Sequence, residues 1–225
     1  MDRLIIPTLK SLVVGVVTLG LMLFLPAGTF SYWQAWALIA IFVLGSNAIG
    51  VYLSIHDPEL LERRKQAGPQ AETRPAQKII ILVLIAALVA MLAVSALDHR
   101  FGWSDIPAPV CLAGQALAAV GLYITFLVVK ENSFSASTIK VFENQKVIST
   151  GPYAVVRHPM YSGTLILTLA SPLALGSWWG FLPVLLVIPL LVWRIFDEEM
   201  LLNAELPGYA GYANRVRYRL LPFGW

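Results

Sequence analysis

Long apolar runs separated by short polar segments dominate the first 130 positions of the chain. The runs lie at residues 9–26, 33–55, 79–97 and 108–129, and none has a charged residue in its middle. A helix needs about 20 apolar residues, with a range of about 17–25, to cross the hydrocarbon core of a bilayer, so each run predicts a membrane-spanning helix. We expect the first run to be retained as a span, because Pro26-Ala27-Gly28-Thr29 is a poor signal-peptide cleavage site.

A fifth apolar stretch has a different pattern. Residues 161–192 carry no charge, which is too long for one ordinary span. Pro172, Gly176 and Gly180 interrupt this stretch, and residues of these types favour turns. We therefore expect a hairpin of two helices, at about 161–175 and 179–196.

The basic residues indicate how these helices are oriented. With six crossings, fifteen of the sixteen Lys and Arg residues lie on one side of the membrane and only Arg100 lies on the other. Cytosolic loops carry an excess of Lys and Arg, so this side is the cytosol. The sequence thus predicts an all-α, multi-pass integral membrane protein of about six membrane-embedded helices, four spans plus a C-terminal helical hairpin. Both termini and the active site are expected on the cytosolic side.

Composition and charge narrow the chemistry. The chain is 58% hydrophobic and 13% charged, which excludes a disordered chain and argues against a water-soluble one. The net charge of +3 does not indicate a nucleic-acid partner. One cysteine and three scattered histidines argue against disulfides and a metal site. Sequence motifs for dinucleotides, phosphate loops and zinc hydrolysis are missing, so we expect a small organic cofactor.

Polar residues collect in the cytosolic segments. Residues 58–66 predict a short amphipathic helix, for which contact with the lipid interface is an alternative to a solvated surface. The loop at 130–159 is about 30 residues long, and loops of that length are usually functional. A tight hairpin brings residues 157–161 close to residues 194–199, where Arg194 and Glu198 share one helix face. Ionisable groups at membrane depth tend to mark function, so we place the site here.

These residue types suit a zwitterionic ligand with a ring. His158 could hold a carboxylate, Glu198 an amine or a ribose, and Tyr153 or Tyr161 could pack on an aromatic face.

One motif adds a family resemblance. Residues 151–163 read GPYAVVRHPMYSG, which resembles the signature of the isoprenylcysteine carboxyl methyltransferase family and of related phospholipid N-methyltransferases. The resemblance continues through Arg194-x-x-x-Glu198-Glu199, Tyr209, Tyr212 and Leu221-Pro222-Phe223. It spans residues 132–223, about 40% of the chain.

The resemblance implies S-adenosylmethionine as methyl donor and a catalytic region at residues 131–225, after a four-span membrane region at 1–130 with a cytosolic loop at about 56–78. Arg194 would face the methyl acceptor and orient it, and Thr138 would be a further contributor. The acceptor would be lipophilic or small: an isoprenylcysteine carboxylate, a thiol or a lipid amine. Positions carried over for cofactor binding are Gln145, Lys146, Val147, Ile148, Tyr153, His158, Pro159, Met160, Tyr161 and Glu198.

Two alternatives remain open on the sequence. Membrane sterol and lipid reductases that use NADPH have a similar Arg-His-Pro-x-Tyr-x-Gly motif and C-terminal layout. A non-enzymatic transport or structural protein would need polar residues inside the spans, and those present, such as Asn47 and Gln115, are few.

Overall fold

The chain forms an all-helical bundle in which four helices are long and apolar enough to cross a membrane. The computed structural model describes residues 2–225, with side chains from Ile5 onward, and this part contains only helices, turns and loops. The fold class predicted from the sequence, a multi-pass helical membrane protein, is confirmed. The four candidate spans are α1 (Asp2–Ala27), α2 (Trp33–His56), α4 (Pro75–Phe101) and α5 (Ala108–Glu131).

The predicted C-terminal hairpin is present as α6 (Pro159–Leu175) and α7 (Phe181–Glu205). Gly176 ends α6 with a φ of +75°, a left-handed conformation that glycine adopts without steric cost. In the turn, the Ser177 hydroxyl donates to the Asp98 carboxylate at 2.5 Å, and the Trp178 N–H donates to the Ser104 hydroxyl at 3.0 Å. The turn therefore lies beside the α4–α5 loop, at the same end of the bundle.

Glycines allow α5 and α6 to pack at very short range. A Cβ atom at Gly121 would lie 2.7 Å from the Gly163 carbonyl oxygen, and one at Gly114 would lie 2.4 Å from the Ala174 nitrogen. Small residues of this kind let helix backbones approach closely in membranes. The contact fixes the start of α6, which carries His158 at its N-cap, next to the end of α5.

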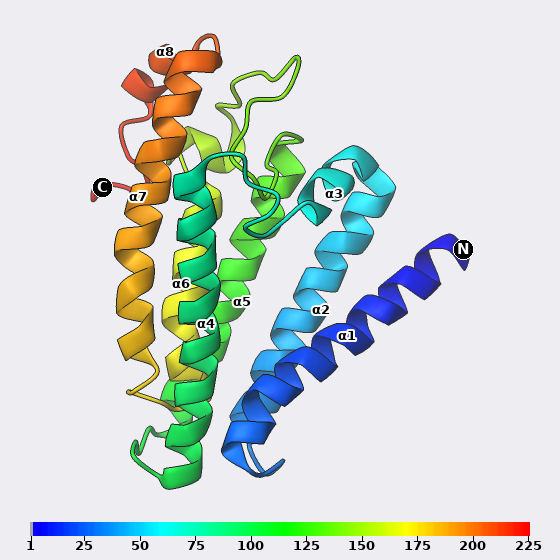
Figure 1. Ribbon diagram of the computed structural model, residues 1–225, viewed down its shortest axis with the longest axis vertical. Coiled ribbons are helices and arrows are strands. Elements are labelled where there is room, and N and C mark those ends of the chain that lie inside the picture. The colour runs from blue at the N-terminus through cyan, green and yellow to red at the C-terminus, as the bar shows by residue number, and fades with distance from the viewer. Residues whose placement is uncertain (1) are drawn as a thin grey trace.

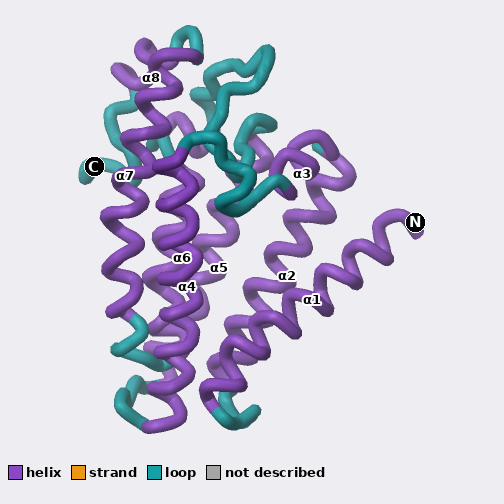
Figure 2. Tube along the Cα trace, in the orientation of Figure 1, coloured by secondary structure: helices purple, strands orange, loops and turns teal. Residues whose placement is uncertain are grey.

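The longer loops and short helices gather at one end of the bundle, at the top of Figure 1. Figure 2 shows these long loops there and only short connections at the opposite end. The sequence predicted the helix α3, at 58–66, but not η1 or α8. The elements at this end are α3 (Pro58–Lys65), the 3-10 helix η1 (Gly151–Ala154) and α8 (Tyr209–Arg215).

Apolar side chains cover the outer surface of the long helices. Leu44, Leu82 and Leu185 are each more than half exposed, on α2, α4 and α7 respectively. Such exposure is unfavourable in water and is expected where lipid is the solvent. Polar side chains are instead concentrated inside the loop-rich end, where the candidate site lies.

Candidate active site

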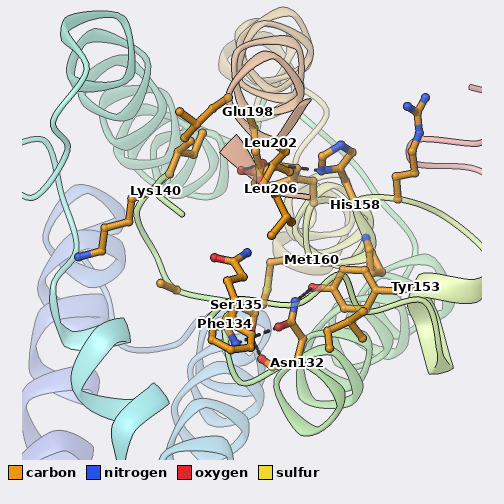
Figure 3. A pocket seen from close by; sticks show the side chains of 18 of the residues that line it. Asn132, Phe134, Ser135, Lys140, Tyr153, His158, Met160, Glu198, Leu202 and Leu206 are labelled. Atoms are coloured by element: carbon orange, nitrogen blue, oxygen red, sulfur yellow. Dashed lines mark hydrogen bonds and ion pairs between the residues drawn. The ribbon is translucent and has the colours of Figure 1, made fainter. Parts of the chain in front are cut away.

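A cavity of about 250 Å³ opens at the loop-rich end of the bundle. The 132–148 loop, the start of α6, the C-terminal half of α7 and α8 enclose it. Figure 3 shows its lining side chains converging from these separate segments. Arg194 and Thr138 line it, as do all ten residues expected at the cofactor: Gln145, Lys146, Val147, Ile148, Tyr153, His158, Pro159, Met160, Tyr161 and Glu198.

The buried carboxylate of Glu199 holds one wall together. Its Oε1 lies 2.9 Å from Arg157 Nη1 and 3.1 Å from His158 Nε2, and its Oε2 accepts from Arg219 Nε at 3.0 Å. Burial alone would raise the pKa of Glu199. The hydrogen bonds from His158 and Arg219, with the nearby charge of Arg157, outweigh burial and hold that pKa below its ordinary value. Glu199 therefore stays ionised and orients His158.

Tyr161 connects the two charged residues that the sequence analysis placed on one face of α7. Its hydroxyl donates to Glu198 Oε2 at 2.7 Å and accepts from Arg194 Nε at 3.0 Å. The sequence placed Arg194 and Glu198 on one helix face as i and i+4 neighbours, a spacing at which oppositely charged side chains can pair directly. The structure shows the Tyr161 hydroxyl between them instead, which leaves Glu198 Oε1 without a donor among the described residues.

Arg194 is buried and is held by residues just before and at the start of α4 and by the loop that precedes α6. Its Nη1 donates to Glu72 Oε1 at 3.0 Å and to Gln77 Oε1 at 2.6 Å, and its Nη2 donates to the Ser137 carbonyl at 3.1 Å. Four of its five N–H groups are thus used inside the protein, counting Nε. One Nη2 hydrogen remains for a ligand.

The α3–α4 segment also anchors α7 directly. Arg74 Nη2 lies 2.5 Å from Asp197 Oδ1, and Gln77 Nε2 donates to Asp197 Oδ2 at 2.5 Å. Glu72 Oε2 accepts from the Ile139 N–H at 3.2 Å. This segment therefore fixes both α7 and the loop that encloses the cavity.

A second wall is aromatic. Asn132 Nδ2 donates to the Tyr153 hydroxyl at 2.9 Å, as the dashed line in Figure 3 shows, and the Tyr212 hydroxyl donates to the Tyr153 carbonyl at 2.8 Å. Burial raises the pKa of Tyr153, and it raises the pKa of Tyr212 to about 12. Both phenols therefore remain protonated. Leu206 and Val147 pack beside them and make this side of the cavity largely apolar.

Several polar groups in the lining lack a partner. The Thr138 hydroxyl and the Tyr209 hydroxyl are buried and have no hydrogen bond within the described residues. The N–H groups of residues 146–148 likewise donate to no acceptor in the part of the chain that the structure describes. Buried polar groups are normally satisfied, so the two hydroxyls are suited to hold a polar ligand, and the free N–H groups of the loop can add further donors. Next to an apolar wall and a free carboxylate oxygen, they suit a zwitterionic ligand with a ring, as the residue types in the sequence indicated.

Sequence reasoning missed the residues that hold Arg194. Glu72 and Gln77 lie in a segment that was interpreted as a solvated helix and loop, yet both are almost completely buried. No spacing rule relates them to α7, because the contacts span more than 100 residues. The one feature of the sequence that could have indicated this role is the position of Glu72, an acidic residue within the basic segment at 56–78.

The fold and the cavity together define a multi-pass membrane protein with a loop-enclosed ligand site. Residues 110–205 match the family model described as phospholipid methyltransferase, so this part of the chain is similar to that family. No curated protein matches the chain significantly. The match confirms the resemblance seen in the sequence, and it favours the methyltransferase over the reductase and the non-enzymatic alternatives.

Proposed function

We propose that the protein transfers a methyl group from S-adenosylmethionine to a lipophilic or small acceptor at the boundary between membrane and cytosol. The observation that carries this proposal is the convergence on one cavity of all eleven residues carried over from the family motif. These residues come from the 132–148 loop, η1, α6 and α7, which are up to 53 positions apart in the chain. The family match supports methyl transfer as the reaction class.

Glu198 and His158 would bind the amino-acid end of the cofactor. Glu198 Oε1 is free to accept from an ammonium group, while His158 is fixed by Glu199 at the N-terminus of α6. The free N–H groups of residues 146–148 and the aromatic wall at Tyr153 would take the nucleoside part. When bound, S-adenosylmethionine supplies a methyl group on a positively charged sulfur.

Arg194 would orient the acceptor through its remaining Nη2 hydrogen. Methyl transfer is an in-line displacement, so holding the two reactants in the correct geometry supplies much of the acceleration. The four internal hydrogen bonds of Arg194 fix its guanidinium before the acceptor arrives. An isoprenylcysteine carboxylate, a thiol or a lipid amine would satisfy this arrangement.

The orientation in the membrane follows from charge. The loops and short helices of the loop-rich end hold most of the basic residues, whereas Arg100 lies in the last turn of α4, which supports a cytosolic site with both termini on the same side. We place the catalytic region at residues 131–225. From the cytosolic loop of the N-terminal region, Arg64 lines its cavity, and Glu72 holds the enclosing loop by accepting from the Ile139 N–H.

Calorimetry on the purified protein tests the cofactor. We expect micromolar binding of S-adenosylmethionine and of its demethylated product, and no binding of NADPH. Glu198→Gln should weaken cofactor binding about tenfold, because a charge-assisted hydrogen bond contributes about 1.5–3 kcal/mol. Glu205→Gln is the matched control, since Glu205 is an exposed carboxylate on the same helix. Absence of binding at saturating S-adenosylmethionine would refute the proposal, and binding of NADPH instead would favour a reductase.

A further inference from the structure

Arg64, on α3, is a cation in the cavity wall with no carboxylate partner. Its side chain is half-buried, and no carboxylate of the described residues lies within 4.0 Å of it. Its only side-chain hydrogen bond runs from Nη1 to the Ser135 carbonyl at 2.7 Å. Since a guanidinium has five N–H donors, most of the donors of Arg64 are unused.

The other cations of the lining are either neutralised or exposed. Arg157 and Arg194 each pair with a buried carboxylate, as described above. Lys140 and Lys146 are exposed to solvent. Arg64 is therefore the one lining cation among the described residues that is partly buried and has no carboxylate partner.

This arrangement is costly unless an anion completes it. Taking a charge out of water without a partner is unfavourable. Burial correspondingly lowers the pKa of Arg64, against a smaller opposing effect of Tyr153. Arg194 cannot serve in its place as a two-pronged anion ligand, because only one of its hydrogens is free. A planar guanidinium with free donors is well suited to a carboxylate or a phosphate.

The position of α3 indicates which molecule would bring the anion. Leu60, in the first half of α3, packs in a buried apolar cluster with Leu53 of α2, Val129 of α5 and Met160 of α6. Arg64 thus lies where the cavity meets the membrane-spanning helices. The carboxylate end of the cofactor is assigned above to His158, at the N-terminus of α6. An anion at Arg64 is better supplied by an amphiphile whose apolar part follows the spans.

We propose that Arg64 binds an anionic group, a carboxylate or a phosphate, on an amphiphilic methyl acceptor. This inference rests on the proposed function and specifies its substrate class. Arg64 lies outside residues 110–205, which match the family model, so the inference gives helix α3 a role in substrate recognition.

Three amphiphiles with the same tail test the inference: dodecanoate, dodecyl phosphate and the neutral dodecanamide. Binding of each amphiphile to the protein in phosphatidylcholine nanodiscs is measured by calorimetry without cofactor. We expect at least one anion to bind about tenfold more tightly than the amide. Arg64→Gln should abolish that preference and leave amide binding unchanged, while Arg64→Lys should retain most of it. Arg63→Gln is the matched control, because Arg63 pairs with Glu59 on the same helix.

The outcomes separate the two proposals. Preference for dodecanoate identifies a carboxylate and preference for dodecyl phosphate identifies a phosphate; either supports the inference. No preference in the wild type, or a preference unchanged in Arg64→Gln, overturns it. Binding of S-adenosylmethionine is measured in the same preparations. If the wild-type protein does not bind S-adenosylmethionine, that result counts against the proposed function alone. If the wild type binds S-adenosylmethionine and only Arg64→Gln loses this binding, Arg64 holds the carboxylate of the cofactor and the inference is overturned.

Discussion

The guanidinium of Arg194 donates to the carboxylate of Glu72 at 3.0 Å, across 122 positions of the chain, and both side chains are almost fully buried. The contact joins the loop before α4 to α7, the helix that carries the candidate catalytic arginine. Because the same carboxylate accepts from the Ile139 N–H, it also fixes the loop that encloses the cavity. Glu72 is therefore a positioning residue for the site.

Glu72→Ala should destabilise the protein by about 3–5 kcal/mol, because it leaves the Arg194 charge buried without its partner. Thermal or denaturant unfolding in detergent measures the change. Glu62→Ala is the control: Glu62 pairs with Lys65 on the exposed face of α3, and its loss should cost less than about 1 kcal/mol. Adding Arg194→Met to Glu72→Ala should recover part of the stability. Equal effects of the two single substitutions would contradict the role of Glu72.

Tyr161→Phe should lower kcat/KM for methyl transfer by tenfold or more. The substitution removes the hydroxyl between Arg194 and Glu198, so both lose a hydrogen bond that fixes their position, and small misplacements of catalytic groups cost large factors in rate. Turnover of a radiolabelled methyl donor measures the effect. Tyr123→Phe, on the exposed face of α5, should change turnover by less than about twofold. Unchanged turnover in Tyr161→Phe would show that the Tyr161 hydroxyl between Arg194 and Glu198 has no part in the mechanism.

The Glu199 cluster predicts a stability contribution that depends on pH. A carboxyl whose pKa is lowered on folding stabilises the protein above its ordinary pKa of 4.5, and the contribution is lost as the pH falls through the lowered value. Glu199→Gln should therefore reduce the melting temperature clearly at pH 7, and the difference from wild type should shrink below pH 4.5. Glu205→Gln should change little at either pH. A constant difference across this range would show that charge is not the cause.

Gly121→Ala should destabilise the bundle by about 1–3 kcal/mol or more, because its Cβ would meet the backbone of α6 at 2.7–2.8 Å. Displacement of α6 would also move His158, so cofactor affinity should fall. Gly50→Ala offers a close comparison in α2, where a Cβ meets nothing within 4 Å. That substitution should be neutral or stabilise by up to about 1 kcal/mol. Unfolding curves of both variants measure the difference. Destabilisation by Gly121→Ala alone would indicate crowding against α6, whereas equal destabilisation by both would indicate a general effect of replacing helix glycines.

Local pattern was enough to predict the helical framework. The apolar runs at 33–55 and 108–129 end within two residues of the observed α2 and α5, because the length of a span is set by the thickness of the bilayer. Pro172, Gly176 and Gly180 located the hairpin turn, because turn formation depends on the residues at the turn itself. The hairpin in turn predicted that residues 157–161 and 194–199 meet.

The motif indicated which residues would share a site, and only the tertiary structure determined what each side chain contacts. Glu72 and Gln77 reach Arg194 from a segment with no periodic relation to α7, so no local rule could predict the contact. The Tyr161 hydroxyl separates Arg194 from Glu198, and Arg64 has no carboxylate beside it, for the same reason. The sequence determined which segments enter the membrane, because hydrophobic transfer depends on the composition of each segment. The partners of the buried charges were decided by the three-dimensional arrangement, because electrostatic and hydrogen-bonding interactions act over a few ångströms between residues distant in the chain.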